Sequence, residues 1–515
     1  MKKVFFFILM INPLNQCFGQ ITVDPFQEFV SDEKNLTSAG AVYPSLVSRF
    51  YKEYGYSLAW MSEKQNENRQ IFFHDLEKSN DLGLNKLSYH YNTMLSLNAG
   101  KEPMDNWRDS TAADILITDA AIHFYAEVKN GDARPTLKYD GLNYTPDMQG
   151  IPILIAAALN NDSLAKLLPS LEPNSAEYNN TKRLLLHFNQ ILNKPGFNEI
   201  VIHSMKMDSS NKPLYQKLFQ LGFLKSASTQ VSSKDLSNAL VTAQKLFSLL
   251  SDGVFRSTAK EALNVPLKER IRQLLATLNL IRWLNEIKNN DNVVLLNIPS
   301  ASLFTYSKGE KILDSRVIVG KPSTPTPRLT SKITEVILYP YWNVPNKIAT
   351  RELLPNIKRN IGFLGQNNFQ VLNKQWKIVD PYKINWSSLS PSYFPYLIRQ
   401  STGCDNSLGI VKLNFYNPFS VYLHDTPGKG LFFLNKRYFS HGCMRVEKAI
   451  DLARLIAKHQ VAVINQMEDE GCLKNQQPVI LKADNPMNLF VIYSVAWYDV
   501  NGNMSFFDDP YKISN

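Results

Sequence analysis

The sequence lacks the features of membrane-spanning, repetitive and disordered proteins. No apolar run reaches the roughly 20 residues that a helix needs to cross a bilayer, and no internal repeat or low-complexity tract is present. Hydrophobic residues make up 44% and charged residues 20% of the chain, which is typical of folded proteins and excludes wholesale disorder. A length of 515 residues predicts two to four folded domains.

A nucleic-acid-binding module is also missing. The formal net charge is +10, but the lysines and arginines are spread along the chain and form no basic stripe. This charge suits a polyanionic environment such as a cell envelope, although it identifies no partner. We therefore expect no nucleic-acid partner and, at most, a peripheral association with a membrane.

The first residues have the pattern of a secretory signal peptide. A positively charged start precedes the short apolar run 4–11, and small residues follow it. The pattern predicts cleavage before Gln20, so that residues 1–19 are removed on export to the periplasm or cell envelope. Lipidation at Cys17 remains an alternative.

Cysteines are scarce, and their number is informative. If Cys17 leaves with the leader, Cys404, Cys443 and Cys472 remain. An odd number in an exported protein leaves at least one free thiol or an intermolecular bond. Since an unpaired cysteine is a liability in an oxidising compartment, one of the three is expected to perform chemistry. Whether Cys404 and Cys472 pair stays open.

Hydrophobic periodicity divides the chain into a helical front and a β-rich rear, so the predicted fold class is multidomain α+β. Helices are predicted over 112–128, 153–159, 234–250, 257–263, 267–288 and 447–458. Strands are predicted over 293–298, 302–306, 312–319, 335–338, 420–423 and 461–464. Hairpin turns are expected at Ser307-Lys308-Gly309-Glu310 and, in a terminal hairpin, at Asn501-Gly502.

One segment carries residues suited to nucleophilic catalysis. His424 precedes the run Ser440-His441-Gly442-Cys443-Met444-Arg445. A thiol with an ordinary pKa of about 8.5 is only a few per cent ionised at neutral pH, so it needs an activator. His424 can take the thiol proton before attack and return it to a leaving amine.

The residues around Cys443 suit acyl transfer. Gly442 permits close backbone approach, and the N–H groups of Gly442 and Cys443 are predicted to form an oxyanion hole. The helix expected just after Val446 would direct its positive end toward Cys443 and favour the thiolate. Arg445 would lower the pKa of the thiol or hold a substrate carboxylate. His441 is interpreted as a positioning residue rather than an acid or base.

In this order and spacing, His424, Ser440 to Cys443 and Arg445 resemble the signature of the L,D-transpeptidase catalytic domain. The wider chain resembles the large YcbB-type murein L,D-transpeptidases in the runs 316–320, 341–345, 406–409, 422–427 and 495–499. The resemblance implies that His424 is the general base and that Cys443 forms a thioester with a peptidoglycan stem peptide. It also implies acylation of Cys443 by carbapenems.

The resemblance further implies a domain organisation. After the signal peptide come a helical scaffold domain at 20–205, a peptidoglycan-binding-like module at 206–266, a connecting helix at 267–290, a catalytic domain at 291–466 with a capping insertion at about 346–415, and a C-terminal β extension at 467–515. Arg256 stands where such modules usually carry glycine, so glycan binding is not assigned to the module.

Further residues are expected at the site. Ser440 and Asp425 are predicted to position the catalytic groups, and either Asp425 or a backbone carbonyl would orient His424. Tyr422, Trp342 and Asn406 are predicted to contact the substrate, although aromatic residues at strand ends more often pack in a core.

Several other functions compete with transpeptidation. Water in place of the acceptor amine would make the same site an L,D-carboxypeptidase. A sortase-like enzyme also has His, Cys and Arg in this order but lacks Ser-His-Gly before its cysteine, and a wall-binding scaffold would need neither Cys443 nor His424. A zinc site of His424, His441 and Cys443 lacks the paired-cysteine spacing of structural sites. We therefore expect neither metal nor cofactor.

Overall fold

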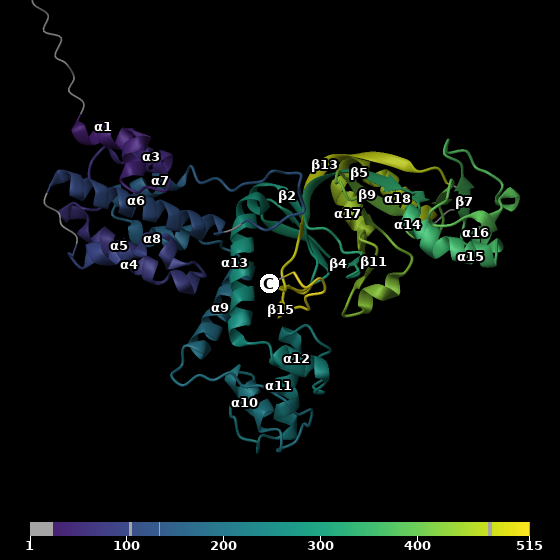
Figure 1. Ribbon diagram of the computed structural model, residues 1–515, viewed down its shortest axis with the longest axis horizontal. Coiled ribbons are helices and arrows are strands. Elements are labelled where there is room, and N and C mark those ends of the chain that lie inside the picture. Colours follow the sequence, from purple (N-terminus) through teal and green to yellow (C-terminus); the bar gives the residue numbers. More distant parts are fainter. Residues whose placement is uncertain (1–23, 102–105, 133, 472–475, 514–515) are drawn as a thin grey trace, which may run out of the picture. The chain divides into compact units, whose positions relative to one another are not determined.

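The computed structural model describes residues 24–101, 106–132, 134–471 and 476–513 (Figure 1). The predicted signal peptide, Cys17 and Cys472 lie outside these residues. Export, lipidation at Cys17 and pairing of Cys404 with Cys472 therefore stay untested. Among the described residues, no helix is both long and apolar enough to cross a lipid bilayer. The chain divides into two compact units: unit 1 comprises residues up to Glu77, 86–125 and 149–168, and unit 2 comprises 78–85, 126–148 and 169 onward.

Unit 1 is helical. Its elements are α1 (Pro25–Ser31), α2 (Glu33–Ser38), α3 (Pro44–Tyr54), α4 (Asn66–Glu77), α5 (Tyr91–Asn98), α7 (Ile151–Asn160), most of α6 (Trp107–Asn130) and the start of α8 (Leu164–Leu171). Asp24 and Asp32 cap α1 and α2 through their carboxylates, and Gly55 ends α3 in the left-handed conformation. The helices predicted over 112–128 and 153–159 are confirmed as α6 and α7.

A buried carboxylate organises unit 1. Asp114, on α6, is inaccessible to solvent. It accepts hydrogen bonds of 3.0, 2.7 and 2.9 Å from three consecutive main-chain N–H groups, those of Ala59, Trp60 and Met61. The Tyr51 hydroxyl donates a fourth at 2.7 Å. Burial raises the pKa of Asp114, and these four donors oppose the rise. The carboxylate thereby ties an irregular segment to the longest helix of the unit.

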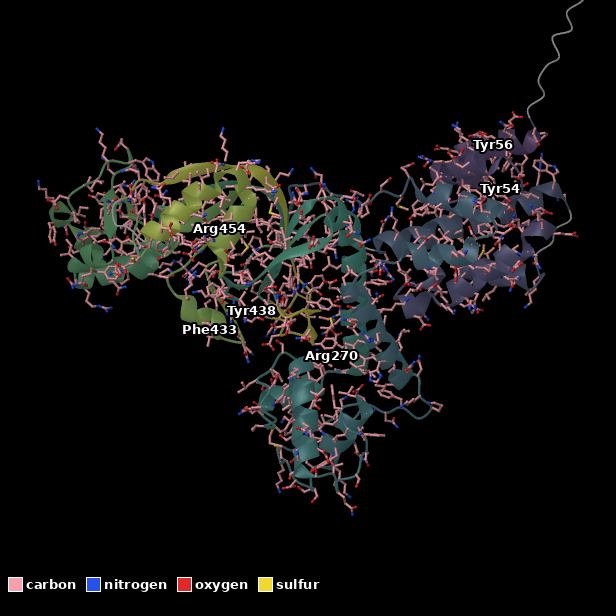
Figure 2. The ribbon with its side chains drawn as sticks, turned by 180° about the vertical axis from the view of Figure 1, so that it is seen from behind. Tyr54, Tyr56, Arg270, Phe433, Tyr438 and Arg454 are labelled. Atoms are coloured by element: carbon pink, nitrogen blue, oxygen red, sulfur yellow. The ribbon has the colours of Figure 1, made fainter. Side chains whose placement is uncertain are left out.

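The helical part of unit 2 contains α9 (Ala176–Leu192), α10 (Lys212–Gln220), α11 (Ser233–Leu246), α12 (Ser257–Leu263) and α13 (Leu267–Asn290). Helix α11 ends before the predicted residue 250, because Ser248 takes a positive φ of 52°. The guanidinium of Arg270, labelled in Figure 2, lies 4.8 and 4.5 Å from the ring centroids of Phe247 and Phe506. These contacts join α13 to the end of α11 and to the C-terminal hairpin.

The β-rich part of unit 2 is built on one large sheet. Its strands are β1 (Tyr139–Asp140), β2 (Asn292–Asn297), β3 (Ser302–Ser307), β4 (Glu310–Gly320), β5 (Leu329–Leu338), β9 (Val411–Phe415), β10 (Leu423–His424), β11 (Tyr438–Ser440), β12 (Met444–Val446) and β13 (Val479–Ile492). The order is β1-β5-β13-β2-β3-β4-β12-β10-β9, with β11 beside β4. Because β9 also pairs with β5, the sheet closes into a barrel.

The barrel has an apolar interior, and two parts of its outer surface differ in what they carry. Alternate residues such as Val294, Leu303 and Leu423 fill the interior together with α17 (Ala449–Ile456). Helix α13 lies along the outer face of β2 and β3 (Figure 1), where it packs on Leu295 and Phe304. The predicted catalytic residues occupy β10 and β12, in another part of the outer face.

Two predictions near the C-terminus differ from the structure. Strand β13 lies between β5 and β2, so residues 479–492 of the predicted C-terminal extension belong to the large sheet, whereas the β14–β15 hairpin (496–506) forms a separate sheet. The run 461–464 begins helix α18 (Val461–Glu470) and is not a strand, so that prediction is wrong. Ile464 and Met467, three residues apart, are its buried positions, which is the helical spacing that a four-residue window is too short to reveal.

A smaller subdomain is inserted between β5 and β9. It holds a second sheet of order β6-β8-β7, formed by β6 (Trp342–Asn343), β7 (Phe369–Leu372) and β8 (Leu397–Gln400). Helices α14 (Asn346–Ile348), α15 (Leu354–Arg359) and α16 (Gly362–Gln366), with a π-helical turn at Ala349–Leu353, complete a separate hydrophobic core. Since β9 belongs to the large sheet, this capping subdomain ends before Val411, earlier than the predicted residue 415.

Two predicted turns are confirmed. Lys308 and Gly309 connect β3 and β4 with φ of 48° and 87°, as a type I′ hairpin turn requires. The C-terminal hairpin pairs β14 (Ala496–Tyr498) with β15 (Met504–Phe506), and Gly502, at φ 80°, lies in its turn.

We predict that Asp114→Ala destabilises unit 1 by about 3 kcal/mol or more, because three main-chain donors and one hydroxyl lose a buried acceptor. Scanning calorimetry of the whole chain measures this as a lowered transition temperature. Glu53→Ala, on an exposed position of α3, is the matched control and should leave the transition unchanged. An Asp114→Ala transition equal to that of the control would contradict the assigned role.

Candidate active site

Three neighbouring strands direct the predicted catalytic residues to one outer face of the barrel. In β10, His424 lies opposite Arg445 of β12 in parallel pairing and opposite Lys412 of β9 in antiparallel pairing. The preceding pairs join Leu423 to Met444 and to Leu413, all buried in the barrel interior. Because strand side chains alternate, the row that contains His424 faces outward.

Cys443, the predicted nucleophile, lies one row along the strands from this histidine. Tyr422 and Cys443 immediately precede Leu423 and Met444, and the Met444 N–H donates to the Tyr422 carbonyl at 3.0 Å. Tyr422 and Cys443 are therefore neighbours across the two strands, which makes Cys443 the diagonal neighbour of His424. The Tyr422 and His424 rings meet edge to face, with centroids 5.7 Å apart.

The structure holds His424 in its neutral form. It is 5% exposed, and its Nδ1 lies 2.6 Å from the main-chain carbonyl of Asp425, which can only accept a hydrogen bond. The proton is therefore on Nδ1, and the lone pair is on Nε2. Burial, followed by the charges of Arg445 and Lys412, lowers the pKa of His424 to about 3, while the Asp425 carbonyl opposes the change. The imidazole is thus neutral at physiological pH.

The carboxylate of Asp425 does not orient His424. It accepts the Ile410 N–H at 3.2 Å and pairs with Lys429. Gly409 is required beside it, because a Cβ at that position would lie 2.2 Å from the carboxylate. Of the two predicted alternatives, the backbone carbonyl is therefore the group that contacts the histidine.

Cys443 is the free cysteine of the described residues, whereas Cys404 is disulfide-bonded. Burial raises the pKa of the Cys443 thiol. Hydrogen bonds from the backbone and side chain of Tyr422 oppose this rise, as do the charges of Lys412 and Arg445. The thiol is therefore mainly protonated at neutral pH and depends on a base for attack.

The helix predicted to activate this thiol does not do so. Helix α17 begins at Ala449, and β12 runs between it and Cys443. A strand of three residues spans roughly 10 Å, whereas the effect of a helix terminus falls off within one turn. The expectation that a helix end favours the thiolate is therefore wrong, and side-chain cations supply the positive charge.

Lys412 is a site residue that sequence reasoning missed. It alternates with the buried Val411 and Leu413 on β9, and its ammonium lies 4.2 Å from the Tyr422 ring centroid. Burial lowers the pKa of Lys412, and the charge of Cys443 opposes that change. The alternation in the run Val411–Phe415 was the available signal, but its place beside Cys443 depends on long-range pairing.

A groove of about 460 Å³ lies beside Tyr422, the cross-strand neighbour of Cys443. Lys412, Asn414 and Tyr422 line it, together with Glu335 of β5, whose carboxylate accepts a hydrogen bond of 3.1 Å from Asn414. Arg445 lies in the row of His424, outside the lining of the groove, and its buried Nε has no hydrogen-bond partner among the described residues. The lining of the groove thus carries one ammonium group and one carboxylate.

The loop before Cys443 is closed by its own hydrogen bonds. Ser440 Oγ donates to the Cys443 carbonyl at 2.5 Å and accepts the Gly442 N–H at 3.1 Å. Thr326 also donates to the Gly442 carbonyl at 2.9 Å, and Gly442 takes a φ of 113°. Because the Gly442 N–H is occupied, the Cys443 N–H, which has no partner in the described structure, is the better candidate for an oxyanion donor.

The capping subdomain contacts two residues near Cys443, namely Tyr422 and His441. Trp342, on β6, hydrogen-bonds to Tyr422. His441 Nε2 lies 2.7 Å from Glu352 Oε1 in the capping π-helical turn and 3.5 Å from the Lys321 ammonium. Trp342 and His441 therefore link the cap to the catalytic strands. No group of three or more His, Cys, Asp or Glu residues within the described ranges is arranged to hold a metal ion.

Asn406 is not available to a substrate. It is 1% exposed, and its side-chain amide donates to the Pro340 and Ser401 carbonyls at 3.0 and 2.8 Å. Its oxygen accepts the Leu408 N–H at 2.8 Å. The residue fixes the return of the chain from the capping subdomain to β9, so the predicted substrate contact is wrong for structural reasons.

Comparison with known proteins agrees with this geometry. Residues 291–464 match the model of the L,D-transpeptidase catalytic domain named YkuD, and residues 45–185 match the Scaffold domain. A relative from Haemophilus influenzae, whose name assigns it provisionally to the L,D-transpeptidases, is 37% identical over 228 residues. That stretch covers 44% of this chain and 46% of the relative, so the match spans less than half of either protein.

Solved structures with which the chain shares partial similarity are also L,D-transpeptidases. Enzyme 3 from Mycobacterium tuberculosis matches 39% of this chain and 60% of its own, with 10% identity and a TM-score of 0.20. The Stackebrandtia nassauensis enzyme matches 57% of this chain and 97% of its own, with 13% identity and a TM-score of 0.19. On the two domain models, the chain carries a YkuD-type L,D-transpeptidase catalytic domain and a Scaffold domain.

Proposed function

We propose that this protein is a peptidoglycan L,D-transpeptidase that joins stem peptides through a thioester on Cys443. The observation that carries the proposal is the diagonal placement of Cys443 and a neutral His424 whose Nδ1 proton is fixed by a backbone carbonyl. This is the arrangement that a cysteine nucleophile and its general base need.

The donor step begins with the thiol protonated. His424 Nε2 takes the proton as the sulfur attacks the carbonyl between the L- and D-centres of a tetrapeptide stem. The imidazolium then protonates the amine of the terminal D-amino acid, which leaves as the thioester forms. Because burial disfavours both thiolate and imidazolium, proton transfer accompanies attack rather than preceding it.

The acceptor step reverses the proton path. Neutral His424 removes a proton from the side-chain amine of a second stem, the amine attacks the thioester, and the thiol is regenerated. In both steps the carbonyl oxygen gains negative charge, and the Cys443 N–H is the donor we assign to it. Water in place of the amine would give the L,D-carboxypeptidase reaction with the same residues.

Two cations beside Cys443 support an anionic substrate. Lys412 and Arg445 form no ion pair within the described part of the chain, and both are partly buried beside the proposed nucleophile. A free carboxylate of the donor stem would neutralise them and thereby orient the scissile carbonyl at Cys443. Tyr422, which hydrogen-bonds the thiol, and Trp342, which hydrogen-bonds Tyr422, would contribute to the wall of the same subsite. Since such a substrate lies in the cell envelope, export through residues 1–19 belongs to the proposal.

We expect the chain to convert tetrapeptide-containing muropeptides into cross-linked dimers and Cys443→Ala to form none, because the alanine variant has no nucleophile. Chromatography and mass spectrometry of the products measure this, and a carbapenem should add its mass to the parent chain alone. The disulfide-bonded Cys404 is left intact in both proteins. Tripeptides without dimers would reassign the reaction to hydrolysis, and dimers from Cys443→Ala would contradict the mechanism.

We also predict that the rate of Cys443 alkylation by iodoacetamide rises with pH to a midpoint above the ordinary cysteine range. A raised pKa means that the thiolate appears only at higher pH, and no acidic plateau is expected because His424 stays neutral. Tyr422→Phe and Lys412→Met should each move the midpoint to still higher pH, since both parent groups favour the thiolate.

Lys268→Met, on an exposed position of α13, is the control and should leave the alkylation profile unchanged. A midpoint near neutrality, or a plateau of reactivity at acidic pH, would instead indicate a preformed thiolate–imidazolium pair and would contradict the neutral-pair mechanism.

A further inference from the structure

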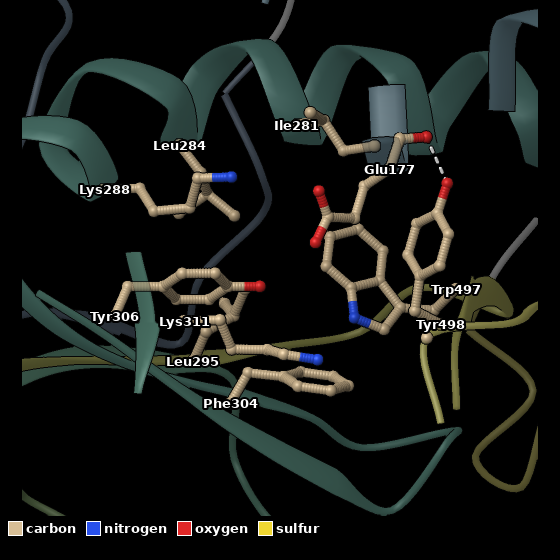
Figure 3. Close-up of a pocket in the computed structure, with 11 residues that line it drawn as sticks. Glu177, Ile281, Leu284, Lys288, Leu295, Phe304, Tyr306, Lys311, Trp497 and Tyr498 are labelled. Atoms are coloured by element: carbon tan, nitrogen blue, oxygen red, sulfur yellow. Dashed lines mark hydrogen bonds between the residues drawn. The ribbon is translucent and has the colours of Figure 1, made fainter. Parts of the chain in front are cut away.

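A second recess lies on the outer face of β2 and β3, where α13 packs (Figure 3). Its volume is about 450 Å³, including the space open to solvent at its mouth. Leu295, Phe304 and Tyr306 of the two strands form one wall. None of the proposed catalytic residues lines it, so it is separate from the groove beside Tyr422.

Polar groups from four elements converge in this recess. Figure 3 shows the ammonium groups of Lys288 and Lys311, the Glu177 carboxylate and the Tyr306 hydroxyl directed into the same space. They come from α13, β4, α9 and β3, and these four side chains, all within the described residues, form no hydrogen bonds with one another. Such convergence within an aromatic pocket is typical of a small-molecule site.

Trp497 supplies a second, independent observation. Its side chain lies in the recess and is only 4% exposed. Its indole Nε1 is buried and has no hydrogen-bond partner among the described residues. A buried donor without an acceptor is unfavourable, so a ligand oxygen in the recess would satisfy it.

The charges in the recess are unevenly matched. Lys288 is 9% exposed, and its ammonium lies 4.9 Å from the Tyr306 ring centroid without an ion pair. Lys311 lies 5.8 Å from the Phe304 ring centroid on the solvent side. Two ammonium groups thus face one carboxylate, that of Glu177. Burial lowers the pKa of Lys288, and a bound carboxylate would counter that effect.

The walls are fixed before any ligand binds. The Tyr498 hydroxyl donates to the main-chain carbonyl of Glu177, drawn as a dashed line in Figure 3, and lies 2.6 Å from the Thr181 hydroxyl. These contacts join the first turn of α9 to strand β14, which also carries Trp497. Gly502, in the turn of the β14–β15 hairpin, lies at the rim. The donors and the acceptor are therefore preorganised.

We propose that this recess binds a small free amino acid. Its carboxylate accepts hydrogen bonds from Lys288, Lys311 and the Trp497 indole N–H, and its ammonium group pairs with Glu177. A simple anion would leave Glu177 unpaired and repelled, whereas a zwitterion uses both signs of charge. The site stands on this geometry alone and does not depend on the reaction proposed for Cys443.

The test is a titration of the whole chain, labelled with ¹⁵N at its tryptophan indoles, with glycine, L-alanine, D-alanine and sodium acetate. We expect one indole resonance, absent from Trp497→Phe, to shift saturably with at least one amino acid. Lys311→Met, at an exposed position that should not affect folding, should weaken this binding about tenfold, because one charge-assisted hydrogen bond is lost. Glu177→Gln should weaken amino-acid binding but leave any response to acetate unchanged.

Three results would overturn the proposal. No shift of the Trp497 resonance with any of the three amino acids, in a sample whose other resonances show it folded, would mean that the recess has no such ligand. Equal affinity for acetate and alanine, unaffected by Glu177→Gln, would reduce the recess to a simple anion site. Alanine binding that is unchanged in both Lys311→Met and Lys288→Met would place the bound carboxylate elsewhere.

Discussion

The pairing of β10 between β9 and β12 is the constraint on which the rest of the site depends. β10 is only two residues long, and its Leu423 fits the barrel interior while His424 faces outward. A slip of one residue would exchange the two and place an imidazole among apolar side chains. Closure of the barrel through β5 and β9 prevents that slip, because every strand of the ring is paired on both sides. Fold stability and catalytic geometry therefore rest on the same register.

The electrostatics of the site follow from this register. One row holds Lys412, His424 and Arg445, so that the histidine stands between two cations in a buried position. Both effects keep it neutral and available as a base. The same two cations counter the rise in the pKa of the Cys443 thiol that burial causes one row away. The capping subdomain adds the contacts of Trp342 and Glu352, which hold Tyr422 and His441 on either side of the nucleophile.

The sequence predicted what is local and missed what is long-range. The motif from Ser440 to Arg445 could be recognised because it is one continuous run, and His424 because it lies shortly before that run in the sequence. The α+β class, α13 and both hairpin turns could also be predicted, since periodicity and Asn-Gly or Lys-Gly turns are local signals. Lys412 could not be placed at the site, because its position depends on pairing β9 with β10. The error at α17 came from overlooking that Met444 to Val446, within the motif itself, form strand β12, which separates Cys443 from the helix.

The proposed mechanism requires a covalent intermediate on Cys443. The most direct measurement is the intact mass of the chain mixed with a tetrapeptide donor in the absence of acceptor, followed by peptide mapping. The account predicts a transient mass increase equal to the donor minus its terminal D-amino acid, located on the peptide that contains Cys443 and removed by hydroxylamine, as a thioester would be. Product formation without an adduct on that peptide, or an adduct on another residue, would contradict it.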